Sequence, residues 1–316
     1  MTVGIEHLIE LLLQPIGSYR IRDAAALERF RTLSSRYADV CNRMLGALDA
    51  SDPQAPGYDW TGWAASVRRA FRQRVPNDFL GVPVLRHTMV YSRRRGIENT
   101  KYRIRLVREA FGEEVTRRLL REDPIGQPII TTLRYLTSAN GAHHAMHLAE
   151  YRKATGESFW DSGSFVEWGG GYGNMARLVR RMNGRATFTI IDLPELSALQ
   201  YVYLGALEGE TQVHIVDPAR PEIRPGKINL VSVHDVGALP LRADAFVSTW
   251  ALTESPRDAQ NDVAQSDFFG ARRVLLASAR NENNALYDAV DSLRVRRVPI
   301  PEAARIGAGN EYWFRS

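Results

Sequence analysis

Cysteine is almost absent from this sequence of 316 residues, in which Cys41 is the only one. A single cysteine excludes an intrachain disulfide, a CxxC redox pair and a cysteine-based zinc site, and it favours a reducing compartment. The chain also lacks a run of about 18 apolar residues, so no transmembrane helix is predicted. Glu6 and Glu10 interrupt the short apolar stripe at the start, which does not fit a signal peptide. We therefore expect a soluble, cytoplasmic protein that does not enter a membrane.

Charge of one sign is not in large excess either. The formal net charge is +5, and charged residues make up 24% of the chain. Arginines cluster at 93–95, 103–108 and 117–121, a density that can neutralise nucleic-acid phosphates. Acidic residues interleave from Glu98 onward, however, which is typical of solvated helix faces. We therefore interpret the arginine clusters first as ordinary solvated surfaces. Binding of an anionic small substrate is the second interpretation, and binding of nucleic acid is the last.

The first half of the chain, residues 1–155, is predicted to be a mainly helical domain. Apolar residues recur at steps of three and four, which is the spacing of one helix face. We expect this domain to cover a site as a lid and to provide the surface of a homodimer. Helices are predicted over 5–13, 23–50, 60–74 and 101–122 with a weak point at Gly112, one or two helices over 128–156, a turn-rich break over 51–59, and an extended piece over 82–92.

The second half, residues 156–316, alternates short β-branched runs with helical patterns. Such alternation predicts an α/β fold with a Rossmann-like, doubly wound and mostly parallel sheet. Helices are expected over 174–184, 193–207 and 256–270. Strands are expected over 164–169, 186–192, 211–216, 228–235, 244–251 and 272–279, with a final hairpin-like pair near 295–300 and 311–316.

A glycine-rich turn follows the first strand of this half. Glu167, Gly169, Gly171 and Gly173 fit the spacing [DE]-x-G-x-G-x-G. Glycines there permit positive φ and let the backbone approach a ligand closely. The same letters contain Gly171-x-Gly173-x-x-Ala176, the dinucleotide fingerprint with alanine in its last place. The glycines therefore predict a nucleotide-like ligand without choosing among such ligands.

Three acids at successive strand ends favour S-adenosylmethionine (SAM). Glu167 stands just before the glycines, where a carboxylate suits the cationic amino group and sulfonium of SAM better than a pyrophosphate. Asp192 ends the second strand and can accept hydrogen bonds from ribose hydroxyls, in SAM or in NAD. Asp235 can accept from the adenine amino group, with Val236 and Leu239 packing on the ring, although a turn or helix-cap role is an alternative.

At this point the sequence resembles a family of sugar O-methyltransferases. The segments that carry the resemblance are FVEWGGGYGNMARLVRRMNGRATFTIIDLPELSALQYVYLGALEG, FVSTWALTESP, DPIGQP and LRYLTSAN, and the match is strongest over about 160–280. These are class I SAM-dependent enzymes associated with bacterial glycan and glycosylated natural-product pathways. The resemblance implies that Glu167, Gly169, Gly171 and Asp192 bind the cofactor and that the segment Trp250 to Glu254 faces the acceptor.

The full set of predicted cofactor-binding residues takes in the neighbours of these motifs: Glu167, Gly169, Gly170, Gly171, Tyr172, Gly173, Asp192, Leu193, His234, Asp235, Val236 and Trp250. Trp168 occupies a position where the family often has an aliphatic residue. Trp168 and Tyr172 flank the glycines, and their roles as packing or as pocket wall stay open. Trp250 and Tyr172 are candidates for stacking on a sugar or an adenine ring.

Methyl transfer to an alcohol gains from a base within hydrogen-bond reach of the hydroxyl. Glu254, after the predicted fourth strand, is one candidate, with a helix-cap role as the alternative. His143, His144 and His147 form the other candidate group, with His143 and His144 preferred, and His143 and His147 share one helix face. A metal site built from these histidines with Glu150 is the weaker interpretation, so no metal is predicted.

The leading hypothesis is a SAM-dependent O-methyltransferase that acts on a hydroxyl of a sugar or glycosylated natural product. Its expected partner is a small-molecule or glycan acceptor. An NAD(P)-dependent oxidoreductase is one alternative, but residues 160–316 contain no catalytic Tyr-x-x-x-Lys. A non-catalytic nucleoside-binding or RNA-binding module that uses the arginine clusters is the other.

Overall fold

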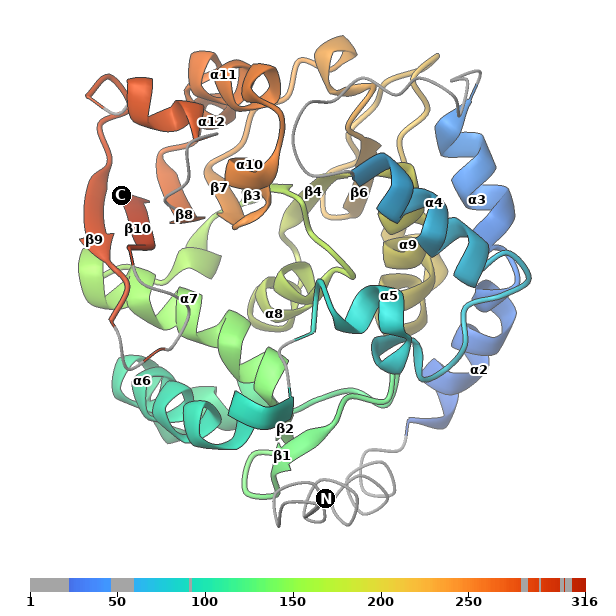
Figure 1. Cartoon of the computed structure of the whole chain (residues 1–316), viewed down its shortest axis with the longest axis horizontal. Helices are drawn as coiled ribbons and strands as arrows, with labels where there is room; N and C mark the ends of the chain where they lie inside the picture. The colour runs from blue at the N-terminus through green and yellow to red at the C-terminus, as the bar shows by residue number, and fades with distance from the viewer. Residues whose placement is uncertain are drawn as a thin grey trace.

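The computed structural model describes residues 23–46, 60–90, 93–279, 284–289, 291–301, 304 and 309–316 (Figure 1). The helix predicted over 5–13 and the break predicted over 51–59 lie outside these residues. Within the described ranges, none of the helices combines the length and the apolar composition needed to span a membrane.

Among the described residues, eight strands form one sheet in the order β5-β6-β4-β3-β7-β8-β10-β9. The strands β3 to β8 run parallel to one another, and β10 is antiparallel to both β8 and β9. Their bounds are β3 Ser164–Trp168, β4 Thr187–Asp192, β5 Val213–Ile215, β6 Ile228–Ser232, β7 Ala245–Thr249, β8 Arg273–Ser278, β9 Arg296–Pro299 and β10 Glu311–Arg315. The predicted doubly wound, mostly parallel α/β sheet and its final hairpin are therefore confirmed.

Alternate residues of each strand face opposite sides of the sheet, because side chains in a strand have a period of two. Phe165, Phe188 and Ile190 belong to a large apolar cluster on the first face. Val166 and Ile191 belong to a smaller cluster on the second face. Burial on both faces explains the nearly continuous apolar runs in the sequence.

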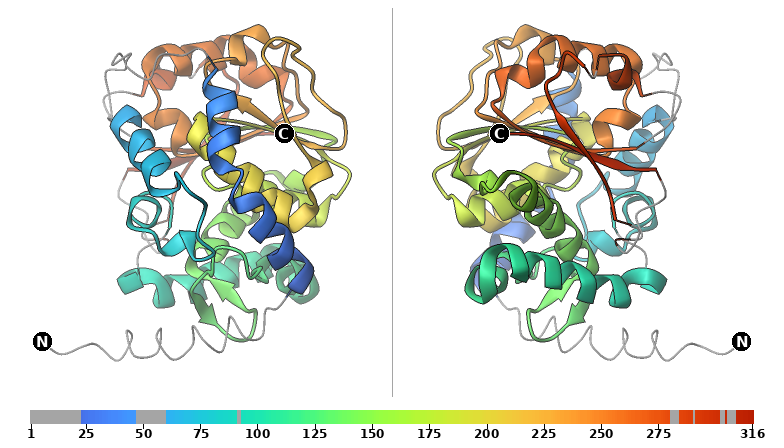
Figure 2. Two further views of the ribbon diagram at one scale, coloured as in Figure 1. Left: turned by 90° about the vertical axis from the view of Figure 1, so that its right-hand side faces the viewer. Right: turned by 90° about the vertical axis from the view of Figure 1, so that its left-hand side faces the viewer.

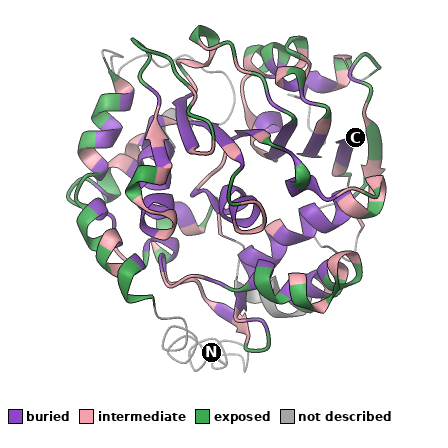
Figure 3. Ribbon diagram, turned by 180° about the vertical axis from the view of Figure 1, so that it is seen from behind, coloured by how far each residue is buried: buried purple, intermediate pink, exposed green. Residues whose placement is uncertain are grey.

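The first face carries the longer helices, α7 Ala139–Thr155, α8 Asn174–Met182 and α9 Pro194–Glu208. The N-terminal half packs outside them: α2 Ala24–Ser34 and α3 Tyr37–Leu45 lie against α9, and α6 Arg93–Leu120 lies against α7 (Figure 2). The predicted weak point in α6 is confirmed, because Gly112 interrupts it with φ 79°. One continuous apolar cluster joins the N-terminal helices to this face of the sheet. Figure 3 shows the buried residues, in purple, on the inner sides of the helices and along the strands.

The second face carries short elements: η4 Val236–Ala238, α10 Ala251–Glu254, α11 Arg257–Gln265 and α12 Asp267–Gly270. The helix predicted over 256–270 is therefore broken. Asp267, Phe268 and Phe269 have positive φ values of 51°, 55° and 58°, which a right-handed helix cannot contain.

Three predictions for the N-terminal half were wrong. The helix predicted over 23–50 is broken, because α2 ends at Ser34 and α3 begins at Tyr37. The described part of the piece 82–92 is not extended, because α5 Pro83–Arg86 begins there with Pro83 in its first turn, where proline is tolerated. The start of 128–156 is not helical, because β1 Ile130–Thr132 pairs with β2 Thr137–Ser138 before α7 begins. The remaining elements are α4 Trp60–Ala70, η1 Phe79–Gly81, η2 Phe159–Asp161, η3 Glu210–Gln212 and η5 Ala285–Ala289.

Candidate functional site

The winding of the sheet changes direction between β3 and β7. From β3 the chain continues to β4 and β6 on one side, and it then returns to β7 and β8 on the other. In open parallel sheets, ligands bind outside the carboxyl ends of the strands at such a switch point. The glycine turn follows β3 and the segment 250–254 follows β7, so the structure brings these two predicted segments together at that edge.

The first two glycines of the turn stand where a side chain would collide with neighbouring residues. Gly169 has φ 73°, and a Cβ atom there would lie 2.0 Å from the Cβ of Ala251. Gly170 meets a different limit, because its Cβ would lie 2.6 Å from Cγ2 of Ile190 and 3.1 Å from Oε2 of Glu167. The turn is therefore packed against both β4 and the segment after β7, as a cradle for a closely approaching ligand requires.

Glu167 is a buried carboxylate without a partner at this turn. Its side chain is 2% exposed. Its Oε2 atom accepts no hydrogen bond from the described residues. Burial raises the pKa of Glu167 to about 8, and the neighbouring Asp192 adds to the shift. Because an unpaired buried charge is costly, this carboxyl group is suited to a cation that arrives with a ligand.

Asp192, at the end of β4, is buried and accepts three hydrogen bonds from within the chain. Its Oδ2 accepts from the backbone N–H of Gly171 at 3.0 Å and from Nε2 of Gln200 at 2.8 Å. Its Oδ1 accepts from the backbone N–H of Leu193 at 2.8 Å. Burial raises the pKa of Asp192 to about 7, although these hydrogen bonds oppose the shift. Asp192 therefore fastens the glycine turn to β4, a structural role that the sequence did not reveal.

The segment after β6 lies farther along the same edge. His234 is exposed, and Asp235 and Val236 are half-buried. Asp235 stands at the N-cap position of η4, but its side chain makes no cap hydrogen bond there. Burial raises the pKa of Asp235, and His234 opposes that shift. The predicted alternative of a helix-cap role for Asp235 is therefore not supported.

The segment after β7 is held in an unusual conformation. Trp250 has φ 79° and precedes α10, and its carbonyl accepts from the backbone N–H and the hydroxyl of Thr253. Glu254 is half-buried, and burial raises the pKa of its carboxyl group. Nε1 of Trp60 in α4 donates to the carbonyl of Glu254 at 3.3 Å. The N-terminal half therefore reaches the predicted acceptor side of the site.

The histidines of α7 lie beneath Trp250. Nδ1 of His147 lies 2.7 Å from the hydroxyl of Tyr312, and its ring lies 6.0 Å from that of Trp250. His144 contacts the side-chain amide of Asn174. Burial lowers the pKa of His144 to about 3, so its ring is neutral.

His143 completes this cluster, with its ring 4.6 Å from that of His147. Burial and the neighbouring His147 hold the pKa of His143 well below its usual value. Among the described residues, no three His, Cys, Asp or Glu side chains form a group that could hold a metal ion. The sequence did not single out His147 as the member that contacts Trp250, because β10 and β7 meet α7 only in the fold.

The two aromatics that flank the glycines face opposite sides of the sheet. Tyr172 is 4% exposed, its hydroxyl accepts from Nδ2 of Asn140 at 2.8 Å, and its ring packs against Phe79 and Tyr203. The side chain of Tyr172 is thus part of the core, and only its backbone could serve the predicted cofactor role. Trp168 points to the second face, where its Nε1 donates to Oγ of Ser255 at 2.9 Å and its ring lines a pocket.

A methionine that the sequence did not single out covers the turn. Met89 follows α5 and is half-buried. Its Sδ atom lies 3.5 Å from the position that a Cβ on Gly171 would take. The segment 82–90 thus lies over the glycine turn in this conformation.

No protein-family model matches this chain, and no curated protein matches it either. Solved structures with a similar fold include PigF with SAH, at 13% identity and a TM-score of 0.35, over 53% of this chain and 60% of that chain. The mitomycin 7-O-methyltransferase MmcR matches at 15% identity and a TM-score of 0.36, over 70% of this chain and 68% of that chain.

A mutant of MtNAS in complex with S-adenosylmethionine matches at 11% identity and a TM-score of 0.36, over 95% of both chains. At these identities and scores the likeness decides nothing about function. The fold itself is a mostly parallel eight-stranded α/β sheet preceded by helices. The sugar-specific family stays a prediction.

Proposed function

We propose that this protein is a SAM-dependent O-methyltransferase that acts on a hydroxyl of a sugar or glycosylated natural product. The observation that carries the proposal is the Glu167 carboxyl group, buried beside the glycine turn with an Oε2 atom that no described residue contacts by a hydrogen bond. A ligand with a positive charge stabilises the ionised form of such a group, whereas the pyrophosphate of a dinucleotide offers it no cation.

The other predicted cofactor residues surround Glu167 along the same edge. The glycine turn and Leu193 would hold the cofactor at the ends of β3 and β4. Asp192 would accept from its ribose, and Asp235 with His234 and Val236 would border its adenine. S-adenosylmethionine supplies an electrophilic methyl group bound to a sulfonium. The residues of this chain would hold that group in line with the acceptor oxygen, since alignment contributes most of the catalysis in such a displacement.

The acceptor side is proposed to lie between Trp250, Glu254 and the histidines of α7. Glu254 is our first candidate for the general base, because it is half-buried at this edge and burial raises the pKa of its carboxyl group toward neutral pH. His143 and His144 are weaker bases, since burial lowers the pKa of each imidazole. Residues 1–155 are proposed to act as a lid, as the contacts of Trp60 and Met89 suggest.

The decisive test is calorimetric titration of S-adenosylhomocysteine (SAH) into the full-length chain and its Glu167→Gln variant. Glutamine keeps the shape of the side chain but loses its charge, so we expect an affinity about 10- to 100-fold weaker, as for a lost hydrogen bond to a charged group. Glu222→Gln is the matched control, because Glu222 is exposed and remote from the turn. Binding of NADH without any response to SAM or SAH would replace this proposal with the oxidoreductase.

A further inference from the structure

The second face of the sheet has a gap where a crossover helix would normally lie. Parallel strands are usually joined by a helix that covers the sheet. The connection between β6 and β7, residues 233–244, contains only the three-residue η4. A cavity of about 680 Å³, here called the crossover pocket, lies between this connection and α11 and α12. Its lining residues are Trp168, Val233, Val236, Gly237, Leu239, Pro240, Leu241, Arg242, Ala259, Asp262, Val263, Ser266, Phe269 and Gly270.

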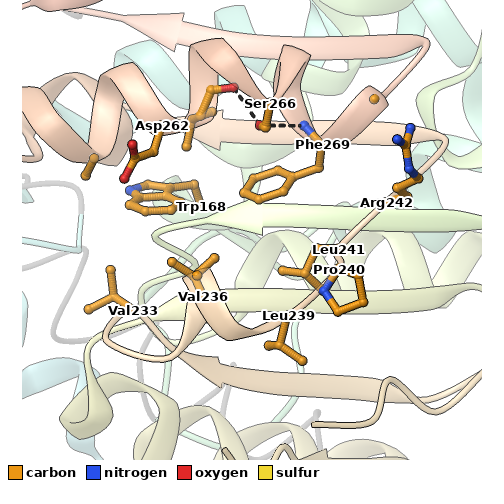
Figure 4. Close-up of a pocket in the computed structure, with 14 residues that line it drawn as sticks. Trp168, Val233, Val236, Leu239, Pro240, Leu241, Arg242, Asp262, Ser266 and Phe269 are labelled. Atoms are coloured by element: carbon orange, nitrogen blue, oxygen red, sulfur yellow. Dashed lines mark hydrogen bonds between the residues drawn. The ribbon is translucent and has the colours of Figure 1, made fainter.

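The walls of the crossover pocket are flat and apolar. Figure 4 shows the rings of Trp168 and Phe269 on one side and the aliphatic side chains of Val233, Val236 and Leu239 on the other. The Trp168 ring is fixed by its hydrogen bond to Ser255. Such a slot fits a planar ring system, because both of its sides offer extended apolar contact.

The Phe269 wall is built from strained backbone. The backbone of Asp267, Phe268 and Phe269 lies in the left-handed region, with positive φ. This conformation costs about 1–2 kcal/mol for each residue. Arg315 holds the turn, since it donates to Oδ1 of Asp267 at 2.6 Å and lies over the ring of Phe268. Oγ of Ser266 accepts from the backbone N–H of Phe269 at 3.0 Å. Strain that the surroundings hold in place is typical of binding sites, and here it directs Phe269 into the pocket.

The crossover pocket extends away from the glycine turn. None of the turn residues 169–173 lines it. Arg242 and Gly270 precede the amino ends of β7 and β8, so the pocket runs along the sheet face from the carboxyl edge toward the amino edge. Arg242 and Asp262 lie at its opposite ends (Figure 4). Arg242 forms no ion pair with any residue that the structure describes.

We propose that the crossover pocket is a second binding site, separate from the glycine turn, for a planar apolar ring system that carries an anionic group. The rings of Trp168 and Phe269 bind the apolar part, and Arg242 binds the anion. The volume is within the range of small-molecule sites, about 300–1,000 Å³. Its lining shares Val236 and Leu239 with the residues predicted to pack on the adenine, but it excludes Glu167, Asp192 and the turn glycines 169–173, so a ligand here does not require the proposed methyl transfer.

The probe is 1-anilinonaphthalene-8-sulfonate (ANS), whose rings and sulfonate have the required chemistry. Fluorescence titration of the full-length chain should give saturable binding of one ANS, unchanged by saturating SAH. Ala259→Trp fills the slot from a half-buried position in α11 and should abolish this binding. Displacement of ANS by SAH, or unchanged ANS binding by Ala259→Trp, would overturn the proposal.

Charge variants test the orientation of the ligand. Arg242→Ala should weaken ANS binding about two- to fivefold, as expected for one partly exposed ion pair. Asp262→Asn, the matched control at the opposite end, should not weaken it. Weakening by Asp262→Asn and not by Arg242→Ala would contradict the assigned anion site. Direct SAH titration of the natural chain and of Ala259→Trp separates the two proposals, because failure of SAH to bind either protein counts against methyl transfer alone.

Discussion

The carboxyl ends of β3 and β4 are neighbours, and each carries a buried acid, yet the fold uses the two acids differently. Asp192 accepts hydrogen bonds from Gly171, Leu193 and Gln200, so its charge is satisfied within the chain. Glu167 has an Oε2 atom with no such bond from the described residues. We conclude that Asp192 stabilises the conformation of the glycine turn, whereas Glu167 is the acid that we propose to contact the ligand.

The Asp192→Ala variant should show the largest effect, because it removes the acceptor of three donors at once. A buried donor left without a partner costs about 1–3 kcal/mol, so we expect a loss of about 3 kcal/mol in the free energy of unfolding. SAH binding should be lost together with the turn. Urea denaturation and calorimetry of the variant measure the two effects.

The control for this variant is Asp288→Ala, which removes an exposed partner of Arg257. An exposed ion pair contributes about 0–1 kcal/mol, so its stability should stay near that of the natural chain. Equal stability of both variants would mean that Asp192 does not hold the turn.

A smaller effect is expected from Gly170→Ala, which tests the space between the two acids. The added methyl group would press on Ile190 and on the Glu167 carboxylate. Overpacking of this kind costs about 1–3 kcal/mol. Gly81→Ala is the matched control, since nothing lies within 4 Å of its added Cβ. Thermal unfolding compares the pair, and equal melting temperatures would show that the turn has room for a side chain.

The smallest effect is expected between pH 7 and 8, where the titration of one group changes the free energy of unfolding by at most about 1.4 kcal/mol. The pKa of Glu167 is raised to about 8 in the folded chain, so its stabilising contribution is complete below its unfolded pKa and is lost as pH rises through 8. Asp192 contributes in the same sense, with a pKa of about 7. The free energy of unfolding should therefore fall as pH rises from about 4.5 to 8.

The Glu167→Gln variant isolates one acid from the other. Glutamine does not titrate, so the free energy of unfolding of the variant should no longer fall between pH 7 and 8. The fall that is due to Asp192, below about pH 7, should remain. Urea denaturation at several pH values in that range measures the difference. An identical pH profile for variant and natural chain would show that Glu167 is ionised without difficulty, which contradicts its unpartnered state.

The sequence was sufficient for the sheet and the glycine turn because both depend on local patterns. Apolar runs, glycine spacing and the acids at strand ends are properties of adjacent residues. The prediction for 82–92 was wrong because its apolar residues suit a strand as well as a short helix, and packing decided between them. The left-handed turn at Asp267 could not be predicted, since it depends on the distant Arg315.

The candidate site was predictable to a similar degree. Glu167 and Asp192 were found from their positions, but only the fold shows that one is satisfied and the other is not. Met89 and Gln200 were missed because their contacts with the site come from distant elements. Their residue types alone carry no signal for such a role, whereas His147 was among the predicted histidines and only its contact with Trp250 is new.

The most direct test of the account is calorimetric titration of SAM into the full-length chain at pH 7 in two buffers with different ionisation enthalpies. A cation that binds beside Glu167 should ionise it, because its pKa of about 8 leaves the carboxyl group mostly protonated at this pH. We predict one SAM per chain and release of about one proton to the buffer. Absence of SAM binding, or binding with no proton release, would contradict the central role of Glu167.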